Sequence, residues 1–359
     1  MMTRPIHGGN LNWAAKLAGC PPSMLLDFSA SINPLGPPDS AIRAIEKGLR
    51  SLKHYPDPNY PQLRLTLGNW HNLPPEWVLP GNGAAELLTW GGRELAALDA
   101  VYVLSPGFRD YKRALDAFGA KIISCPLDVV GRSQNSAQEK DLTLDAPITK
   151  NCGLLLNNPH NPTGQLFSRR SIWQYLDQFA LVVIDEAFMD FLRPEAQESL
   201  IEAVENYPNL VVLRSMTKFY TLPGLRIGYA VAHPQRLQRW EKWRDPWSVN
   251  SLAAEAAVAV VADTEFQEKT WQWLESARSS FYQDLLTIPG LSPLPSVANF
   301  FLVATDIPAT HLQTQLLKQS QILIRDCLSF PELGENYFRI AIRCPEENQK
   351  LINQLKINT

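Results

Sequence analysis

A lysine near the middle of the chain has neighbours that suit it for covalent chemistry with an aldehyde. Lys218 follows the hydroxyl residues Ser215 and Thr217, and Arg226 comes eight residues after it. A guanidinium and hydroxyl groups together suit a phosphate. Taken alone, Lys218 is most simply a solvated surface lysine. Next to these hydroxyl groups and the arginine, the Lys218 amine is expected to have a lowered pKa, which favours imine formation. The set therefore predicts a site for a phosphorylated aldehyde.

A second motif offers an anion site at the start of a helix. The stretch Gly81–Glu86 opens a helical run, so the backbone N–H groups of Gly83, Ala84 and Ala85 can hold an anion. An ordinary helix-entry turn explains the same residues. The motif is a poor dinucleotide fingerprint, because Glu86 replaces the third glycine and no acid ends the next strand. An NAD enzyme is thus disfavoured.

An acidic pair follows another apolar run. Asp185 and Glu186 come directly after Leu181–Ile184. Such a strand end also resembles the magnesium-binding acid of an ATPase, but the chain contains no G-x-x-x-x-G-K-[ST] sequence. A solvated loop acid is the simplest interpretation. A carboxylate in this place is nevertheless well positioned to keep a ring nitrogen protonated.

The elements that must position these residues alternate between short apolar runs and amphipathic stretches. The expected strands are Val101–Leu104, Lys121–Ser124, Gly153–Leu156, Leu181–Ile184, Leu210–Leu213 and Ile227–Ala232. Arg109–Phe118 and Ser168–Phe179 have helical spacing. This alternation predicts an α/β fold around a mostly parallel sheet, and ligands of such sheets bind beyond the carboxyl ends of the strands.

The remainder of the chain predicts a second, smaller α/β part. A long helical region begins at Asn250, and Phe300–Ala304, Ile322–Arg325 and Phe338–Arg343 are expected as strands of a second sheet. Near the N-terminus we expect a helix over 11–19 and an extended stretch over 26–32. The polar stretch Gly131–Asp141 is expected as a surface loop. The predicted organisation is an N-terminal segment 1–44 that packs with the small domain, a large domain 45–248 and a small domain 249–359.

Composition restricts the partners and the compartment. A formal net charge of -3 provides no basic surface for nucleic acid or an anionic membrane. The most apolar long stretch, Leu252–Ala262, is too short to span a bilayer. The five cysteines are scattered without a C-x-x-C pair, so we expect no disulfide framework and no metal site. With no recognisable signal peptide, a cytoplasmic location is expected.

In combination, the motifs resemble those of fold-type I enzymes that use pyridoxal 5′-phosphate (PLP), in the class I/II aminotransferase group. The shared motifs are N-P-x-G at 161–164, D-E-A at 185–187, S-x-T-K at 215–218 and L-P-G-L-R-I-G at 222–228. They occur in the family's order and spacing, and the resemblance covers essentially the whole chain. It implies a transferase fold with a large domain around a mostly parallel seven-stranded sheet and a smaller α/β C-terminal domain.

The resemblance also implies roles for individual residues. Lys218 forms the internal aldimine, Asp185 pairs with the pyridinium nitrogen, Asn161 bonds the ring hydroxyl and Phe108 stacks on the ring. The residues implied at the cofactor phosphate are Gly83, Ala84, Ala85, Ser215, Thr217 and Arg226, with Tyr55 reaching across from the partner subunit of a homodimer. Ala187 stands where many relatives have a tyrosine, which leaves Asn161 as the main donor to that hydroxyl.

Two subfamilies are most similar to the chain: threonine-phosphate decarboxylases of cobalamin biosynthesis and histidinol-phosphate aminotransferases. The stretches His7–Asn10 and Asp27–Pro38 resemble the opening of the decarboxylases, and Ala84–Ala85 replaces two acids usual in the aminotransferases. The resemblance therefore implies decarboxylation of L-threonine O-3-phosphate to (R)-1-amino-2-propanol O-2-phosphate. Histidinol-phosphate transamination is the alternative, and a non-catalytic PLP-binding regulator is a third possibility.

Five residues are expected to bind a small phosphorylated amino acid substrate: His7, Ser31, Asn33, Arg325 and Arg339. In an extended segment, Ser31 and Asn33 would share one face, and Arg339 would share a face with Arg343. Solvated strand faces explain these patterns equally, and a mobile terminus explains His7. Two arginines on a strand that the family uses for anion binding favour the functional interpretation.

Overall fold

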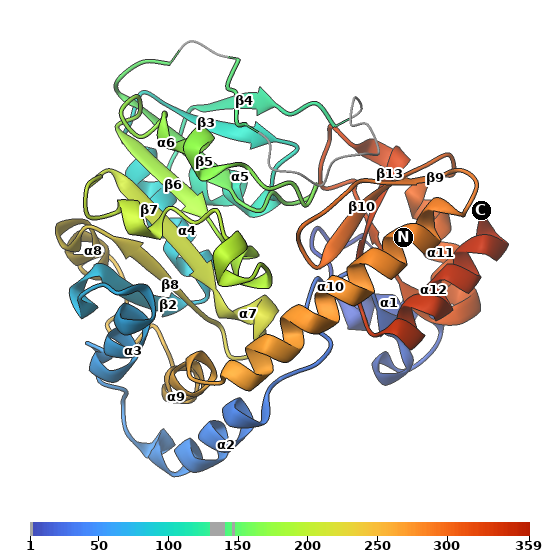
Figure 1. The fold of residues 1–359 in the computed structure, drawn as a ribbon, viewed down its shortest axis with the longest axis horizontal. Coiled ribbons are helices and arrows are strands. Elements are labelled where there is room, and N and C mark those ends of the chain that lie inside the picture. The colour runs from blue at the N-terminus through green and yellow to red at the C-terminus, as the bar shows by residue number, and fades with distance from the viewer. Residues whose placement is uncertain (1–2, 130–140, 146–147) are drawn as a thin grey trace.

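The described residues form a seven-stranded sheet, a four-stranded sheet and a two-stranded sheet that contains Ile322–Leu323, and a long helix connects the two larger sheets. The computed structural model describes residues 3–129, 141–145 and 148–359. The expected loop Gly131–Asp141 therefore lies outside the described residues except for Asp141. Helix α10 (Thr264–Leu286) runs from the side of the larger sheet to that of the smaller sheet (Figure 1).

The larger sheet has seven strands in the order β2-β8-β7-β6-β5-β3-β4. Their bounds are β2 Val78–Asn82, β3 Ala100–Ser105, β4 Ile122–Pro126, β5 Cys152–Asn157, β6 Leu181–Asp185, β7 Leu210–Ser215 and β8 Ile227–Ala232. Strand β8 pairs antiparallel with β2 and β7, whereas the pairs from β7 to β4 are parallel. The predicted mostly parallel seven-stranded sheet is confirmed.

Helices cover both faces of this sheet, which is why β5, β7 and β8 are buried along their whole length. Alternate residues of β6 divide between two apolar clusters, with Val182 and Ile184 in one and Leu181 and Val183 in the other. The first cluster includes residues of α3 (Pro61–His71), α6 (Arg169–Trp173) and α9 (Ser251–Val261), and the second those of α4 (Ala84–Leu95), α5 (Arg109–Asp116) and α8 (Pro234–Glu241).

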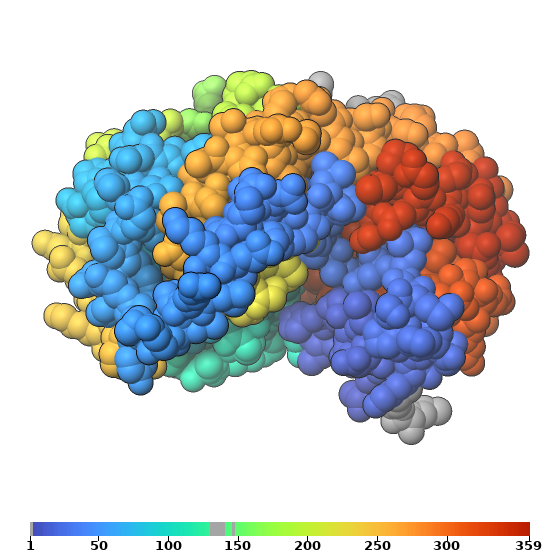
Figure 2. Space-filling model, turned by 90° about the horizontal axis from the view of Figure 1, so that it is seen from below, coloured from blue at the N-terminus to red at the C-terminus, as the bar shows by residue number. Residues whose placement is uncertain are grey.

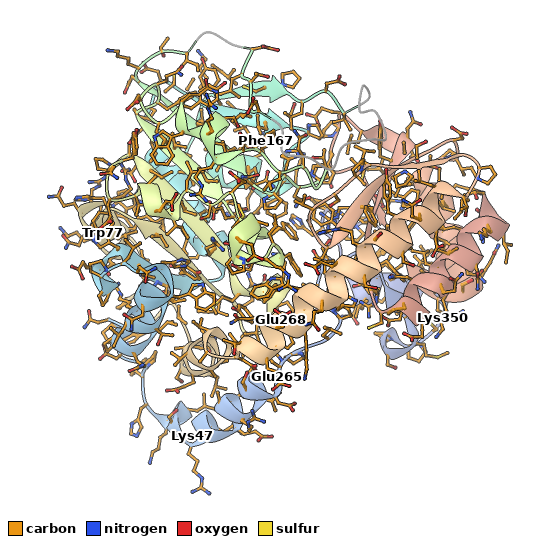
Figure 3. The ribbon with its side chains drawn as sticks, viewed as in Figure 1. Lys47, Trp77, Phe167, Glu265, Glu268 and Lys350 are labelled. Atoms are coloured by element: carbon orange, nitrogen blue, oxygen red, sulfur yellow. The ribbon has the colours of Figure 1, made fainter. Side chains whose placement is uncertain are left out.

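The smaller sheet is antiparallel, with the order β12-β13-β10-β9. Its elements and covering helices are β9 Leu291–Pro293, β10 Phe300–Thr305, β12 Arg325–Asp326, β13 Tyr337–Ala341, α11 Ala309–Ser320 and α12 Pro345–Asn358. The register places Arg325 opposite Arg339. Ion pairs of 2.8 Å from Arg193 to Glu268 and Glu275 join α10 to the larger part, and Figure 3 labels Glu268 on this helix.

The N-terminal residues contact both parts of the molecule. Helix α1 (Leu11–Ala18) packs on α11, and β1 (Leu26–Asp27) pairs in parallel with β11 (Ile322–Leu323). Helix α2 (Asp39–Gly48) instead packs on α9. Figure 2 shows this blue stretch crossing one face of the molecule, from the red C-terminal residues towards the larger part. The predicted boundaries at 44 and 248 stay a prediction, and this packing favours a second boundary after α9.

Several expected elements are shorter than their sequence patterns. The helix expected over 168–179 is α-helical only in α6, and the extended stretch over 26–32 forms only the two-residue strand β1. The remaining helices are α7 Met216–Phe219 and the 3₁₀ helices η1 Pro22–Met24, η2 Leu49–Lys53, η3 Pro75–Trp77, η4 Met189–Phe191, η5 Pro194–Ala196, η6 Ile201–Ala203 and η7 Gly334–Asn336. Within the described ranges, no helix has the length and apolar character needed to cross a bilayer.

Candidate active site

A cavity of about 550 Å³ opens where the strands of the larger sheet end. Asn157 and Asp185, the last residues of β5 and β6, line it from one side, and Arg325 and Arg339 of the smaller sheet line it from the other. Of the residues predicted from the sequence, it is lined by His7, Ser31, Phe108, Asn161, Asp185, Thr217, Lys218, Arg226, Arg325 and Arg339. Residues far apart in the chain are thus brought into one cavity.

Lys218 lies in the short helix α7, immediately after β7. Ser215 caps this helix by accepting from the Thr217 backbone N–H. The Lys218 Nζ donates to Thr217 Oγ1 at 3.1 Å. Burial lowers the pKa of Lys218, the charge of Asp185 opposes this shift, and the positive charge of Arg226 adds to it. A neutral amine, the nucleophilic form, is therefore easier to reach than on the surface.

Asp185 lies at the end of buried strand β6 and lines the same cavity as Lys218. Its Oδ2 accepts from the hydroxyl of Tyr111 at 2.9 Å, and its Oδ1 accepts from the backbone N–H of Ala187 at 3.0 Å. Burial raises the pKa of Asp185, whereas the Tyr111 bond and the charge of Lys218 lower it. These two donors and the nearby lysine favour the carboxylate form.

The start of α4 forms an anion cradle with Arg226. Gly83 precedes the helix with a φ of 76°, and a Cβ atom there would lie 2.6 Å from Arg226 Nη2. A Cβ atom on Gly228 would lie 2.6 Å from the backbone N of Ala84. Glycine is therefore favoured at 83 by its positive φ and required at 228 by contact with backbone atoms. Ala84 and Ala85 begin the helix, where backbone N–H groups have no acceptor within the helix and can bind an anion.

Asn161 and Arg339 meet inside the cavity. Arg339 Nη1 donates to Asn161 Oδ1 at 2.6 Å. Because a guanidinium only donates, this bond fixes the amide orientation and directs the Asn161 Nδ2 group to another acceptor. Burial and the positive charge of Arg325 lower the pKa of Arg339 to about 9. The Arg339 guanidinium carbon also lies 4.9 Å from the ring centroid of Phe300.

Arg325 and Arg339 are two buried cations with little compensation. Arg325 Nη2 donates to the Ile6 carbonyl at 2.7 Å and to Ser329 Oγ at 2.8 Å. Within the part of the chain that the structure describes, neither arginine forms an ion pair with a carboxylate. Buried charges normally require such partners. Their position on a cavity therefore indicates an anion-binding site.

Two aromatic side chains stand at one wall of the cavity. The rings of His7 and Phe108 lie 5.9 Å apart, and Phe108 packs edge-on against Tyr111 at 5.5 Å. Burial and the charge of Arg325 lower the pKa of His7. His7, expected as a substrate residue, is thus held beside both the anion site and the predicted stacking aromatic.

Of the two alternating polar residues, only one reaches the cavity. Ser31 lines it, and its buried Oγ has no hydrogen-bond partner among the described residues. Asn33 is buried elsewhere: its Nδ2 donates to the Phe219 carbonyl and to Thr270 Oγ1, and its Oδ1 accepts from a backbone N–H. The expectation that Asn33 contacts substrate is corrected, because a fully bonded amide away from the cavity supports the α7 region instead.

Tyr55 does not reach the cavity of its own chain. It is 79% exposed and packs against Trp247 with ring centroids 4.6 Å apart. An exposed tyrosine next to an exposed tryptophan agrees with the expectation that Tyr55 acts across a subunit interface.

Three residues that were not predicted contribute to the arrangement. Tyr111 bonds Asp185, and Ser29 and Gly8 hold the N-terminal residues beside the cavity. Tyr111 follows Phe108 by one helical turn on α5, but it shares the apolar face of Ala114 and Leu115 and therefore has the pattern of a core residue. Among the described residues there is no cluster of three or more metal-ligating side chains.

Comparison with known proteins agrees with this geometry. The profile of the family "Aminotransferase class I and II" matches residues 23–355. The threonine-phosphate decarboxylase of Salmonella typhimurium is 38% identical over 98% of this chain and 95% of its own. An adenosylcobalamin biosynthesis bifunctional protein of Leptospira interrogans is 32% identical over 98% of this chain, which spans 41% of that larger protein. The histidinol-phosphate aminotransferase structure from Clostridium acetobutylicum superposes with a TM-score of 0.81 at 27% identity, over 92% of this chain and 98% of the other.

The chain belongs to the class I and II aminotransferase family. Enzymes of this family use PLP, and the residues of the cavity fit that cofactor. The cradle at Gly83 and Arg226 suits its phosphate, and Asp185 suits its ring nitrogen. Lys218 provides a partly buried amine for its aldehyde. The protein is therefore a PLP-dependent enzyme.

Proposed function

We propose that the protein decarboxylates L-threonine O-3-phosphate to (R)-1-amino-2-propanol O-2-phosphate in cobalamin biosynthesis. The single observation that carries this proposal is the pair of buried, carboxylate-free arginines, Arg325 and Arg339, on the cavity that also holds Lys218. Two adjacent guanidinium groups suit a phosphate dianion. The similarity to the Salmonella decarboxylase, which extends through the whole chain, supports the same choice.

The position of the anion site bears on the choice of reaction. PLP, when bound, supplies an electron sink for the bond at Cα that stands perpendicular to its ring. If Arg325 and Arg339 bind the substrate phosphate, neither arginine is engaged with the substrate carboxylate, which would then be free to leave as CO₂. Lys218 Nζ then donates the proton that replaces the departing carboxylate at Cα.

A second candidate is histidinol-phosphate aminotransferase. Histidinol phosphate has no carboxylate, so an anchor for phosphate serves it equally well. The close structural match to the Clostridium acetobutylicum enzyme favours this alternative. The Asp27–Pro38 segment and the alanines at 84 and 85 favour the decarboxylase.

The proposal includes a homodimer in which each active site is shared between the two subunits. It also places the protein in the cytoplasm. Leu49 and Leu52, a few residues before Tyr55 in the chain, are 50% and 56% exposed, and Trp247, which packs against Tyr55, is 45% exposed. Large exposed apolar side chains that gather in this way are typical of an interface. All five cysteines are free thiols, which supports a reducing compartment.

The deciding experiment compares two reactions of the PLP-loaded protein. One reaction measures CO₂ release from L-threonine O-3-phosphate, and the other measures glutamate-dependent transamination of histidinol phosphate. We expect rapid CO₂ release and little transamination. The opposite result would replace the decarboxylase with the aminotransferase.

A further inference from the structure

Residues Arg4–Asn10, here called the N-terminal strap, contribute His7, Gly8 and Gly9 to the lining of the active-site cavity and are held by three contacts. Arg4 Nη1 pairs with Asp326 Oδ2 at 3.1 Å. The Ile6 carbonyl accepts from Arg325 Nη2 at 2.7 Å, and the Gly9 backbone N–H donates to Ser29 Oγ at 2.8 Å. These contacts hold His7 against Phe108, on the cavity wall that also contains Arg325.

Ser29 connects the strap to the body of the protein. Its backbone N–H and its hydroxyl both donate to Asp27 Oδ1, at 2.7 and 2.6 Å. The hydroxyl accepts from Gly9, and the Ser29 carbonyl accepts from Arg339 Nη2 at 3.4 Å. Ser29 is only 2% exposed. Its hydroxyl hydrogen is therefore directed to Asp27, and its oxygen accepts from the strap.

The glycine before Gly9 shows how closely the strap passes over Ser29. A Cβ atom on Gly8 would lie 2.2 Å from the Ser29 carbonyl oxygen. Since real Cβ atoms do not approach backbone oxygen so closely, only glycine allows this contact. Gly9 itself has a φ of 79°. The two glycines after His7 are thus explained by the seating of the strap on Ser29.

We propose that Ser29, held by Asp27, is a positioning residue that fixes His7 at the anion site and so increases the affinity of that site for phosphate. This role of Ser29 rests on the proposed function, because it assumes that Arg325 and Arg339 bind the substrate phosphate. His7 faces Arg325 from β12 and Arg109, Asp110 and Arg113 from α5. In either protonation state the imidazole retains an N–H donor for a phosphate oxygen. A loosened strap would remove that donor without changing either arginine.

The contact between Ser29 and the strap, here called the clamp, is tested first by hydrogen exchange on the PLP-loaded enzyme. Ser29→Ala removes the acceptor of the Gly9 amide, and Gly8→Ala disturbs the same contact from the strap side. Both variants should accelerate amide exchange in residues 3–12 by about tenfold, the scale for one lost hydrogen bond. Ser40→Ala is the matched control, because it breaks another serine–aspartate bond, to Asp263, outside the site. Unchanged exchange in both clamp variants would overturn the proposal.

The consequence for binding is tested by titrating the PLP-loaded enzyme with inorganic phosphate. Ser29→Ala, Gly8→Ala and His7→Ala should each weaken phosphate binding about tenfold, whereas Ser40→Ala should not. Because Ser29 acts through His7, the Ser29→Ala/His7→Ala double variant should bind no more weakly than His7→Ala alone. A further tenfold loss in the double variant would show that Ser29 acts independently and would overturn the proposal.

These measurements separate the strap from the reaction. If the variants weaken phosphate binding as expected but the wild type releases no CO₂ from threonine phosphate, the positioning role of Ser29 stands and only the proposed reaction is wrong. A wild-type protein that binds no inorganic phosphate contradicts both the role of His7 and the anion site of the proposed function.

Discussion

The hydroxyl of Tyr111 donates a 2.9 Å hydrogen bond to Oδ2 of Asp185, the carboxylate expected to pair with the cofactor ring nitrogen. This bond lowers the pKa of Asp185 against the opposing effect of burial. The charged carboxylate is the form that keeps a pyridine nitrogen protonated. Through this bond to Asp185, Tyr111 therefore favours a protonated ring nitrogen.

Removing that bond should weaken catalysis moderately. In Tyr111→Phe the pKa of Asp185 rises further, so we expect kcat to fall about tenfold, the effect of one hydrogen bond to a charged group. Asp185→Ala should cause a far larger loss because the pyridine nitrogen then has no anionic partner. Steady-state kinetics on both variants measure this. Tyr207→Phe is the control, since that hydroxyl bonds Trp173 elsewhere. Wild-type kcat in Tyr111→Phe would contradict the role given to the bond.

The sequence predicted the strands and strand ends well, because buried parallel strands leave continuous apolar runs. Asp185 ends one such run, and the structure places it on the cavity. The pairing of Ser31 with Asn33 failed for a physical reason. Their alternation assumed an extended strand, but Asp27 bonds the backbone and side chain of Ser29 and ends the regular strand there. Side chains beyond that turn no longer alternate between two faces.

Other contacts could not be predicted because they join residues distant in the chain. The Gly8 contact needs the fold that brings residue 29 under the strap. Tyr111 has the spacing of a core residue, and only the docking of α5 on the sheet directs its hydroxyl to Asp185. Motif resemblance named many of the residues that line the cavity, whereas these supporting contacts could only be seen in the folded chain.

Lys218→Ala should abolish both cofactor attachment and activity. No other lysine lines the cavity in the described part of the chain, so the variant should lose the visible absorption of the lysine-bound cofactor. Lys47→Ala is the control, because Lys47 lies on the outer surface of α2 (Figure 3). Absorption spectra and borohydride reduction followed by peptide mapping provide the measurement. A reducible linkage that persists in Lys218→Ala would show that another amine carries the cofactor.

The exposed apolar side chains near Tyr55 predict a dimer that is required for activity. Leu52→Asp places a charge in the exposed apolar stretch that also contains Leu49 and Tyr55, so it should shift the protein towards monomers and lower activity in parallel. Sedimentation velocity and activity are measured over the same concentration range. Met24→Asp, at a residue 61% exposed near the N-terminus, is the control and should leave the dimer intact. A fully active monomer would refute sharing of the sites.

Acid should destabilise the protein through His71. Burial, and secondarily the charge of Arg214, lower the pKa of His71 to about 3, while its Nε2 lies 2.8 Å from the Tyr229 hydroxyl oxygen. The unfolded histidine, with a pKa near 6.5, binds a proton that the folded one does not between about pH 6.5 and 3. Stability is thus complete above about pH 6.5 and falls as the pH drops through that window.

The expected loss from this group is at most about 2 kcal/mol between pH 7 and pH 5, reduced to the extent that the partly buried ring contacts water. Urea unfolding at the two pH values measures it. His71→Gln should lose less stability between pH 7 and pH 5 than the wild type. Substitution of the exposed His311 should leave the loss of stability over the same pH range as it is in the wild type. Equal losses in wild type and His71→Gln would rule out this histidine as the source.

The last prediction concerns the anion that Arg339 holds. If it is the substrate phosphate, Arg339→Ala should weaken threonine phosphate binding by roughly 2 to 4 kcal/mol, the scale for removing one partner of a buried charge pair. Unphosphorylated threonine should already be a poor substrate for the wild type, and the substitution should affect it much less. Arg339→Ala also breaks the Arg339–Asn161 bond; Asn161→Ala removes the same bond together with the predicted contact of Asn161 with the ring hydroxyl, so its effect is an upper limit for that loss.

A double-mutant cycle that pairs Arg339→Ala with removal of the substrate phosphate measures the coupling directly. Strong coupling would place the substrate phosphate on Arg339. If the two losses simply add, Arg339 does not bind the substrate phosphate, and the observation on which the proposed decarboxylation rests is lost.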